Sequence, residues 1–188
     1  AKVKATNPDV LTVSGHSKGA LTAIRQISEM QVDIPMLAMT HCDASKLAKQ
    51  HGKKAEYALC AAQWHKSLSY KDKYFGNGMK YDKDFNAEYG YTPPYQAAES
   101  SAALLVWKDA FERANSTDTE KVRDALAKTD MQTFYGNIKF GSGGQNTAKP
   151  MVLFQVICDG DKCENKVVAP TKWASAKLVH PVPKWSER

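Results

Sequence analysis

The first forty residues alternate between short apolar runs and a helical repeat of apolar positions. Residues 9–14 form a short β-prone run that ends at Gly15. Apolar side chains then recur at every third position between residues 18 and 30, which is typical of the buried stripe of a helix. They are Leu21, Ile24, Ile27 and Met30. A second apolar run follows at residues 35–39, so this order predicts a β-α-β unit with a right-handed crossover.

A short helix and a third strand are expected next. Asp43 and Ser45 are alternative N-caps for a helix over residues 45–51, which Gly52 would end. Residues 55–62 are apolar and strand-like. A third strand following two others in this way is typical of an α/β sheet.

The middle of the chain changes character. Residues 63–94 are rich in aromatic residues, lysine and glycine, and we expect one helix there, over residues 79–90, within an otherwise connecting segment. Residues 95–114 are dense in alanine and predict a long helix.

The last third of the chain passes from helix to strand. Residues 119–129 predict another helix, capped by the stretch 115–118, in which Ser116 or Thr117 and the acids that follow satisfy its free amides. After a glycine-rich turn at residues 141–146, two strand-like runs follow, and residues 171–188 form a tail that we expect to lie extended over a surface. The two runs cover residues 150–157 and 166–170.

Composition is that of a globular protein of one domain or two small lobes. The chain has 188 residues, of which 43% are hydrophobic and 24% charged. No apolar run approaches the roughly 18 residues of a membrane span, and no signal peptide is visible, so we expect any export signal to lie outside this sequence. The net charge of +6 comes from scattered lysines. We therefore expect solvated faces and no nucleic-acid partner.

The four cysteines point to an oxidising compartment. Cys158 and Cys163 frame a tight turn between two apolar runs, a spacing that suits a disulfide across a hairpin. A zinc site would need further cysteines or histidines nearby, and there are none. Cys42 and Cys60 each follow a strand-like run. The alternative is four reduced, buried thiols.

Gly15-His16-Ser17-Lys18-Gly19 fits the nucleophile elbow of an α/β-hydrolase. Asp159 and His180 follow in the chain order that a serine esterase needs. Against this, only 16 residues precede Ser17, which is room for one strand and not for the strands and oxyanion loop upstream of such a nucleophile. His180 also lies in the tail.

A binding role follows from the same turn. A turn after a strand of a parallel sheet lies at the carboxyl edge, where open α/β sheets bind ligands. The first amides of the following helix can hold an anion. We therefore expect His16 and Ser17 to contact a small molecule without attacking it.

The ordered segments resemble the periplasmic substrate-binding proteins of ABC importers of the branched-chain amino acid (Leu/Ile/Val-binding) type. The resemblance extends from about Asn7 to Pro170. The matching segments are NPDVLTVSGHSKGALTAIRQ, IPMLAM, LAKQHGKKAEY, FNAEYGYTPPYQAAESSAALL, AFERANSTDTEKVRDALAKTD, FYGNIKFGSGGQN and VVAP. No single segment is decisive, but the ordered set is far more specific than the five-residue elbow.

The resemblance implies an α/β, type I periplasmic-binding fold with Rossmann-like three-layer lobes, in which a parallel sheet is flanked by helices. This chain resembles the C-terminal half only. Residues 1–62 and 137–188 would form the C-terminal ligand-binding lobe, and residues 65–135 would complete an N-terminal lobe whose larger part is absent. That missing lobe, or a second copy of the chain, is therefore an expected partner.

Matching the family without gaps implies three ligand-binding positions. His16 and Tyr95 stand where amino-acid binders place aromatic residues, and Thr40 stands where they commonly carry a glutamate for the ligand ammonium. Threonine cannot offset that charge, so either Asp43 replaces the glutamate or the ligand lacks an amino group. An aromatic or other small carboxylate would then suit His16, His41 and Tyr95. The alternatives are a turn histidine at His16, a simple strand end at Thr40 and helix packing at Tyr95.

The resemblance implies a non-enzymatic solute-binding protein, which closes on an amino acid or related small carboxylate and delivers it to a membrane permease. Its place would be the periplasm, or the cell exterior with a lipid anchor. His16, His41, Cys42 and Asp43 match no known metal spacing, so we expect no metal and no cofactor. A ligand-sensing regulator of the same fold and a serine esterase are the alternative functions.

Overall fold

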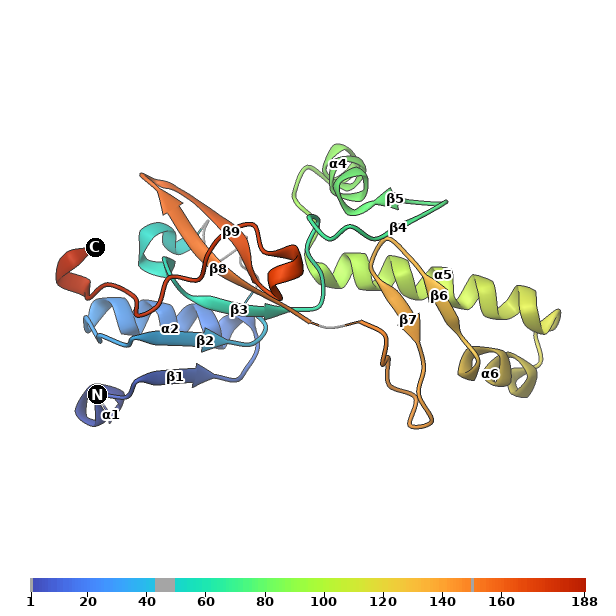
Figure 1. Cartoon of the computed structure of the whole chain (residues 1–188), viewed down its shortest axis with the longest axis horizontal. Helices are drawn as coiled ribbons and strands as arrows, with labels where there is room; N and C mark the ends of the chain where they lie inside the picture. The colour runs from blue at the N-terminus through green and yellow to red at the C-terminus, as the bar shows by residue number, and fades with distance from the viewer. Residues whose placement is uncertain (1, 43–49, 150) are drawn as a thin grey trace. The chain divides into compact units, whose positions relative to one another are not determined.

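The structure, a computed structural model, describes residues 2–42, 50–149 and 151–188. The chain forms two compact units (Figure 1). The first combines Ala1–Ala62 with Val152–Arg188, and the second comprises Gln63–Met151. The sequence interpretation had instead grouped residues 137–151 with the first of these. They lie in the second unit because strand β7 (Asn137–Lys139) pairs with β6 (Asp130–Gln132) there.

A five-stranded mixed sheet forms the centre of the first unit. Its strand order is β1-β2-β3-β8-β9, with β1, β2 and β3 parallel, β8 antiparallel to β3, and β9 antiparallel to β8. The strands are β1 (Val10–Val13), β2 (Met36–Met39), β3 (Leu59–Ala62), β8 (Val152–Asp159) and β9 (Lys162–Ala169). The predicted α/β fold with parallel strands is therefore confirmed, and an antiparallel hairpin completes the sheet.

One long helix connects the first two strands of this sheet. Helix α2 (Ser17–Glu29) buries Ala20 and Ile24 on its apolar stripe, and it joins β1 to the parallel strand β2, as the β-α-β pattern predicts. The unit also contains α1 (Lys2–Thr6) and the short 3-10 helices η1 (Gly52–Ala55), η2 (Thr171–Trp173) and η3 (Trp185–Glu187). The helix predicted over residues 45–51, with Asp43 or Ser45 as its cap, lies largely outside the described residues.

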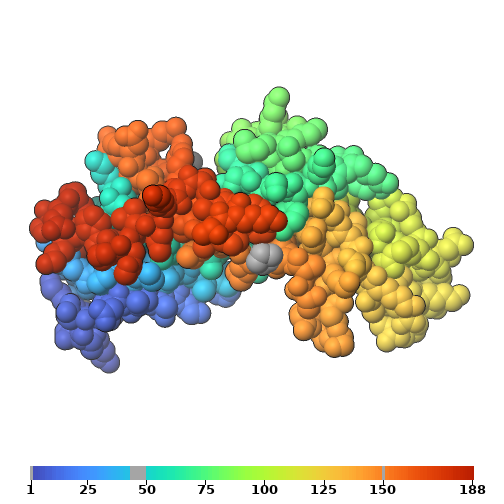
Figure 2. Space-filling model, in the orientation of Figure 1, coloured from blue at the N-terminus to red at the C-terminus, as the bar shows by residue number. Residues whose placement is uncertain are grey.

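The C-terminal tail is tied to the N-terminal part of the same unit. Val182 N donates to Pro35 O at 3.1 Å, and the Trp185 indole donates to Val32 O at 2.9 Å. The side-chain amide of the buried Gln155, in β8, donates to Val179 O and accepts from Val179 N. The red C-terminal segment accordingly lies against the blue segments in the space-filling view (Figure 2). It is extended apart from two short 3-10 helices.

The second unit is built from helices and two small hairpins. Its helices are α4 (Gly78–Tyr89), α5 (Tyr95–Ala114) and α6 (Thr119–Ala127), and β4 (Lys71–Asp72) pairs with β5 (Gly76–Asn77). The predicted capping stretch 115–118 is confirmed, and its acid makes the cap. Asp118 is the N-cap of α6, because its carboxylate accepts from Lys121 N at 3.0 Å, whereas Ser116 Oγ accepts from Asp118 N.

Aromatic rings fill the core of the second unit. Phe134 is fully buried, and its ring stacks on that of Tyr81 with 4.3 Å between centroids. Trp64 and Phe75 meet Phe134 at 6.1 and 5.0 Å. Such rings supply large buried area from few residues, which suits a unit whose sheets have only two strands each.

Candidate functional site in the turns after β1 and β2

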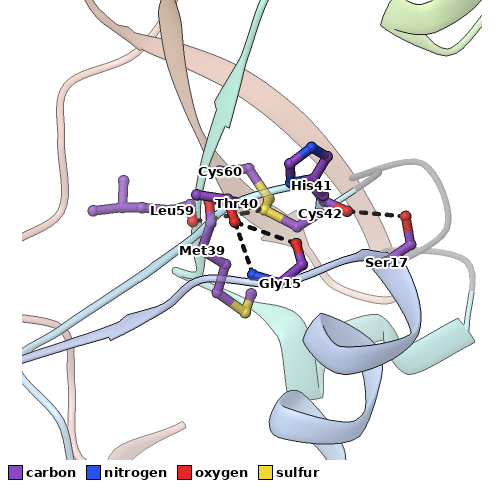
Figure 3. Close-up of a disulfide and its surroundings, with 8 residues drawn as sticks. All are labelled: Gly15, Ser17, Met39, Thr40, His41, Cys42, Leu59 and Cys60. Atoms are coloured by element: carbon purple, nitrogen blue, oxygen red, sulfur yellow. Dashed lines mark hydrogen bonds between the residues drawn. A yellow bond between two sulfur atoms is a disulfide. The ribbon is translucent and has the colours of Figure 1, made fainter.

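Two turns at the carboxyl ends of parallel strands are joined by a reciprocal hydrogen bond (Figure 3). Thr40, which follows β2, accepts from Gly15 N at 3.1 Å through Oγ1 and donates the hydroxyl to Gly15 O at 3.3 Å. Thr40 N also donates to Val13 O at 3.0 Å, so the residue after β2 is bonded to the last residue of β1. The β1 turn is therefore held against the β2 turn by one side chain.

A second connection runs from the start of α2. Ser17 Oγ donates to His41 O at 3.0 Å (Figure 3), which binds the first helical residue to the turn after β2. His41 has a φ of 50°, in the left-handed region that non-glycine residues rarely adopt. Its carbonyl is aimed at Ser17 in that conformation.

A disulfide also anchors the turn after β2. Cys42 is bonded to Cys60 of β3, and both residues are buried. The bond ties the segment after β2 to the neighbouring strand. Cys158 and Cys163 form the predicted hairpin disulfide between directly paired residues of β8 and β9.

The two turns carry two exposed histidines, His16 and His41. The ring centroids of His16 and His41 lie 5.2 Å apart, with the rings tilted by 55°. Imidazoles can donate hydrogen bonds and, when protonated, carry positive charge, so a close pair suits an anionic group. His16 is the N-cap of α2 but makes no side-chain cap bond, so its ring is not engaged at the helix start.

The structure separates the residues of the serine esterase alternative. Ser17 donates its hydroxyl to a carbonyl, whereas a nucleophilic serine needs a hydrogen-bonded base. His180 lies between the tail contacts to Gln155 and Pro35, and Pro35 immediately precedes β2. Asp159 ends β8, which runs antiparallel to β3. Both partners thus lie toward the edge where the parallel strands begin, while Ser17 lies where β1 ends.

Thr40, predicted to bind the ligand, also has a structural role in joining the two turns. Its hydroxyl proton is committed to Gly15 O, and a lone pair to Gly15 N. Asp43, the alternative partner for a ligand ammonium, lies outside the described residues. Among the described residues the structure shows no group of three or more histidine, cysteine or acidic residues arranged to hold a metal ion.

Tyr95 belongs to the second unit, where it is the first residue of α5 and is half-buried. Tyr95 and Glu99, one helical turn later, lie close enough to Tyr135 for their negative charge to act on its phenol. Burial first, and then the charges of Glu99 and Tyr95, raise the pKa of Tyr135 well above its usual value.

Sequence reasoning missed Lys149, which lies beside Tyr135. Lys149 Nζ is 4.3 Å from the centroid of the Tyr135 ring and donates to Gln63 O. Burial lowers the pKa of Lys149 to about 8, while the charge of Glu99 acts in the opposite direction. No pattern around residue 149 signals this environment, because its partner Gln63 is 86 residues away in the chain.

These features define an α/β protein in which the turns after two parallel strands are joined by hydrogen bonds and anchored by a disulfide. A family model for periplasmic binding proteins matches residues 1–162, so the chain belongs to the periplasmic binding protein family. This confirms the family resemblance. Among the described residues, no helix is long and apolar enough to cross a membrane.

Solved structures show the same fold at low sequence identity. A leucine-binding protein from Thermotoga maritima has a TM-score of 0.72 and 21% identity, with 91% of this chain and 47% of that chain covered. A leucine-, isoleucine-, valine-, threonine- and alanine-binding protein from Brucella ovis has a TM-score of 0.74 and 15% identity, with 97% of this chain and 48% of that chain covered. A solute-binding protein of an ABC transporter from R. palustris, in complex with benzoate, has a TM-score of 0.66 and 16% identity, with 94% of this chain and 48% of that chain covered. The chain spans about half the length of these proteins.

Proposed function

We propose that the complete protein containing this chain is an extracytoplasmic solute-binding protein of an ABC importer. It binds a small amino acid or another small carboxylate and delivers it to a membrane permease. Family membership supports this proposal, and structural neighbours are described as binding leucine or benzoate. The two disulfides support an oxidising, extracytoplasmic location.

The main structural support for the proposal is the pair of turns after β1 and β2, which hydrogen bonds and a disulfide hold in place. His16 and His41 are exposed, yet the backbones that bear them are held by Thr40, Ser17 and the Cys42 disulfide. Binding costs less when the recognising groups are already held in place. The turns follow parallel strands at the sheet edge where α/β folds place ligands.

The same geometry favours a carboxylate over an ammonium as the group recognised here. The family resemblance puts a glutamate for the ligand ammonium at position 40, whereas Thr40 has no charge and is engaged with Gly15. The exposed aromatic side chains of these turns are the imidazoles of His16 and His41, and an imidazole attracts an anion when it is protonated. We therefore expect a small carboxylate without an amino group, such as an aromatic acid, to bind better than an amino acid.

A ligand panel on the complete protein tests the proposal. Benzoate, leucine and isoleucine would be added in thermal unfolding experiments, where a ligand at 100 times Kd stabilises the native state by about 2.7 kcal/mol. His16→Ala and His41→Ala should each reduce the shift, and His65→Ala, in the second unit, serves as the matched histidine control. A panel of small acids and amino acids that never moves the unfolding temperature would contradict the proposal.

A further inference from the structure

The two edges of the five-stranded sheet in the first unit differ in how they are covered. At one edge the C-terminal tail bonds to the outer side of β9. Ser175 N donates to Val167 O at 2.8 Å, and Val167 N donates to Ser175 Oγ at 3.1 Å. At the other edge, β1 pairs with β2 alone (Figure 1). One edge is therefore covered by the chain itself, whereas no segment among the described residues pairs with the outer side of β1.

The backbone groups of Val10 and Thr12 point away from β2. Val13 O accepts from Thr40 N, so the backbone of Val13 faces β2. Successive residues of a strand direct their N–H and C=O groups to opposite sides, so Leu11 also faces β2, whereas Val10 and Thr12 face the open edge. In the part of the chain that the structure describes, no other segment bonds to these two residues. They form a row of unpaired donors and acceptors.

The sequence of β1 is typical of a strand inside a sheet. Val10–Val13 reads VLTV, three β-branched residues and a leucine. It has none of the features that keep exposed edges from pairing, because it contains no proline, no charged side chain and no bulge in its register with β2. Its side chains are nevertheless exposed or half-buried, whereas most of β3 is buried. Parallel strands are normally covered on both faces, so β1 lacks a neighbour.

We propose that the open edge of β1 is a docking surface for a further strand, which the part of the complete protein outside this chain supplies. The matches to solved structures cover 91–97% of this chain but 47–48% of those chains, so about half of a relative's length has no counterpart here. The sequence interpretation assigned all of the absent residues to the lobe that contains residues 65–135. The open edge assigns one strand of them to the first unit instead.

The added strand would lie next to the candidate ligand site. Strand β1 leads directly into the turn that carries His16 and Ser17, and Thr40 holds this turn from the β2 side. A second neighbour would fix β1 on its other side as well. The inference concerns the sheet and holds for any solute that the protein binds.

Two other occupants of the edge lead to different expectations. A second copy of the protein would pair its own β1 edge with this one, so the protection of the backbone amides would depend on protein concentration. Water alone would leave the outward amides free to exchange. A strand of the same polypeptide protects them at every concentration, in a molecule with the mass of a monomer.

The test is residue-resolved amide hydrogen exchange of the complete protein by NMR, at two protein concentrations, with the mass in solution measured by sedimentation. The Thr12 amide should exchange at least about 100-fold more slowly than in an unfolded peptide. Leu11 and Val13, whose amides face β2, are the internal control within the same strand. Cross-strand nuclear Overhauser contacts of Thr12 identify the strand that covers it.

Each result supports or overturns the inference. Protection at both concentrations, with contacts from Thr12 to a residue outside this chain, supports it. Protection that disappears on dilution together with a dimer would give the edge to a second copy, and contacts to a residue within this chain would give it to the chain itself. Rapid exchange of Thr12 beside a protected Val13 would leave the edge to water. These last three results overturn the inference, and none of them bears on ligand binding, so the proposed function is tested separately.

Discussion

The two units position their basic side chains by different physical means. In the first unit, His16 and His41 are exposed, and their backbones are held by hydrogen bonds and by the Cys42–Cys60 disulfide. In the second, Lys149 is held by burial against an aromatic ring and a glycine turn. Exposed groups need a braced backbone, whereas buried groups are positioned by the packing around them. The two arrangements should therefore fail under different substitutions.

The largest effect should come from the packed core of the second unit. Phe134→Ala removes a fully buried ring that contacts three other aromatic residues, so the complete protein should lose about 4 kcal/mol of unfolding free energy. Urea denaturation measures this loss. Met79→Ala, at an exposed position of α4, is the control and should change little. A loss below about 1 kcal/mol for Phe134→Ala would show that this unit does not depend on its aromatic core.

The next largest effect should come from the cross-link of the first unit. The Cys42–Cys60 bond spans 18 residues, so replacing both cysteines with alanine should lower the unfolding free energy by about 3 kcal/mol. The Cys158–Cys163 bond spans five residues, and its removal should cost about 2 kcal/mol. Parallel urea titrations of the two double variants compare them. A larger loss for the Cys158–Cys163 variant than for the Cys42–Cys60 variant would indicate that the Cys42–Cys60 bond does not stabilise the turn that carries His41.

Lys149 should give the second unit an unusual pH dependence. Burial lowers its folded-state pKa to about 8 from 10.5, so between these values the unfolded chain binds more protons and stability rises with pH. Below pH 8 the cost of burying the charge is fully present. We expect the wild-type protein to gain about 2 kcal/mol relative to Lys149→Met from pH 7.5 to 10, after solvent screening is allowed for. Parallel pH curves for the two proteins would refute this.

The smallest effect should come from the hydrogen bonds between the turns. Thr40→Val keeps the shape of the side chain but leaves Gly15 without its side-chain partner, which should cost about 1 kcal/mol. Thr40→Ser retains the hydroxyl and should cost less. Thermal unfolding of both variants distinguishes them, and a larger loss for Thr40→Ser than for Thr40→Val would mean that the methyl group, not the hydroxyl, matters at this position.

The sequence predicts most long elements of the fold but not the shortest ones. The predicted helix over residues 95–114 has the same bounds as α5, because an alanine-rich run lies between Pro94 and Asn115. Strands β4 and β6, of two and three residues, were not predicted, since so few positions cannot display a periodic pattern. The capping stretch of α6 was predicted, but the sequence did not single out Asp118, because several adjacent residues there can accept from an amide.

The candidate site was predictable in its positions but not in its contacts. The strand-turn-helix pattern correctly placed His16 and Ser17 at the turn after β1, and Thr40 and His41 after β2. Their bonding partners come from segments about 25 residues away, so local patterns do not reveal them. Lys149 is the extreme case, because its charge is significant only beside Tyr135 and Gln63.

The interleaved order of the two units has a consequence for how the protein acquires its structure. Strand β3 ends at Ala62, yet its antiparallel neighbour β8 begins only at Val152, after the whole second unit. A chain that emerges from its N-terminus therefore exposes one edge of β3 while the second unit is still being made, and an unpaired edge invites pairing with other chains. Both Cys42 and Cys60 have emerged by then, so their bond can secure the segment after β2 to β3 early and shorten the period in which this half-built sheet is free to find the wrong partner.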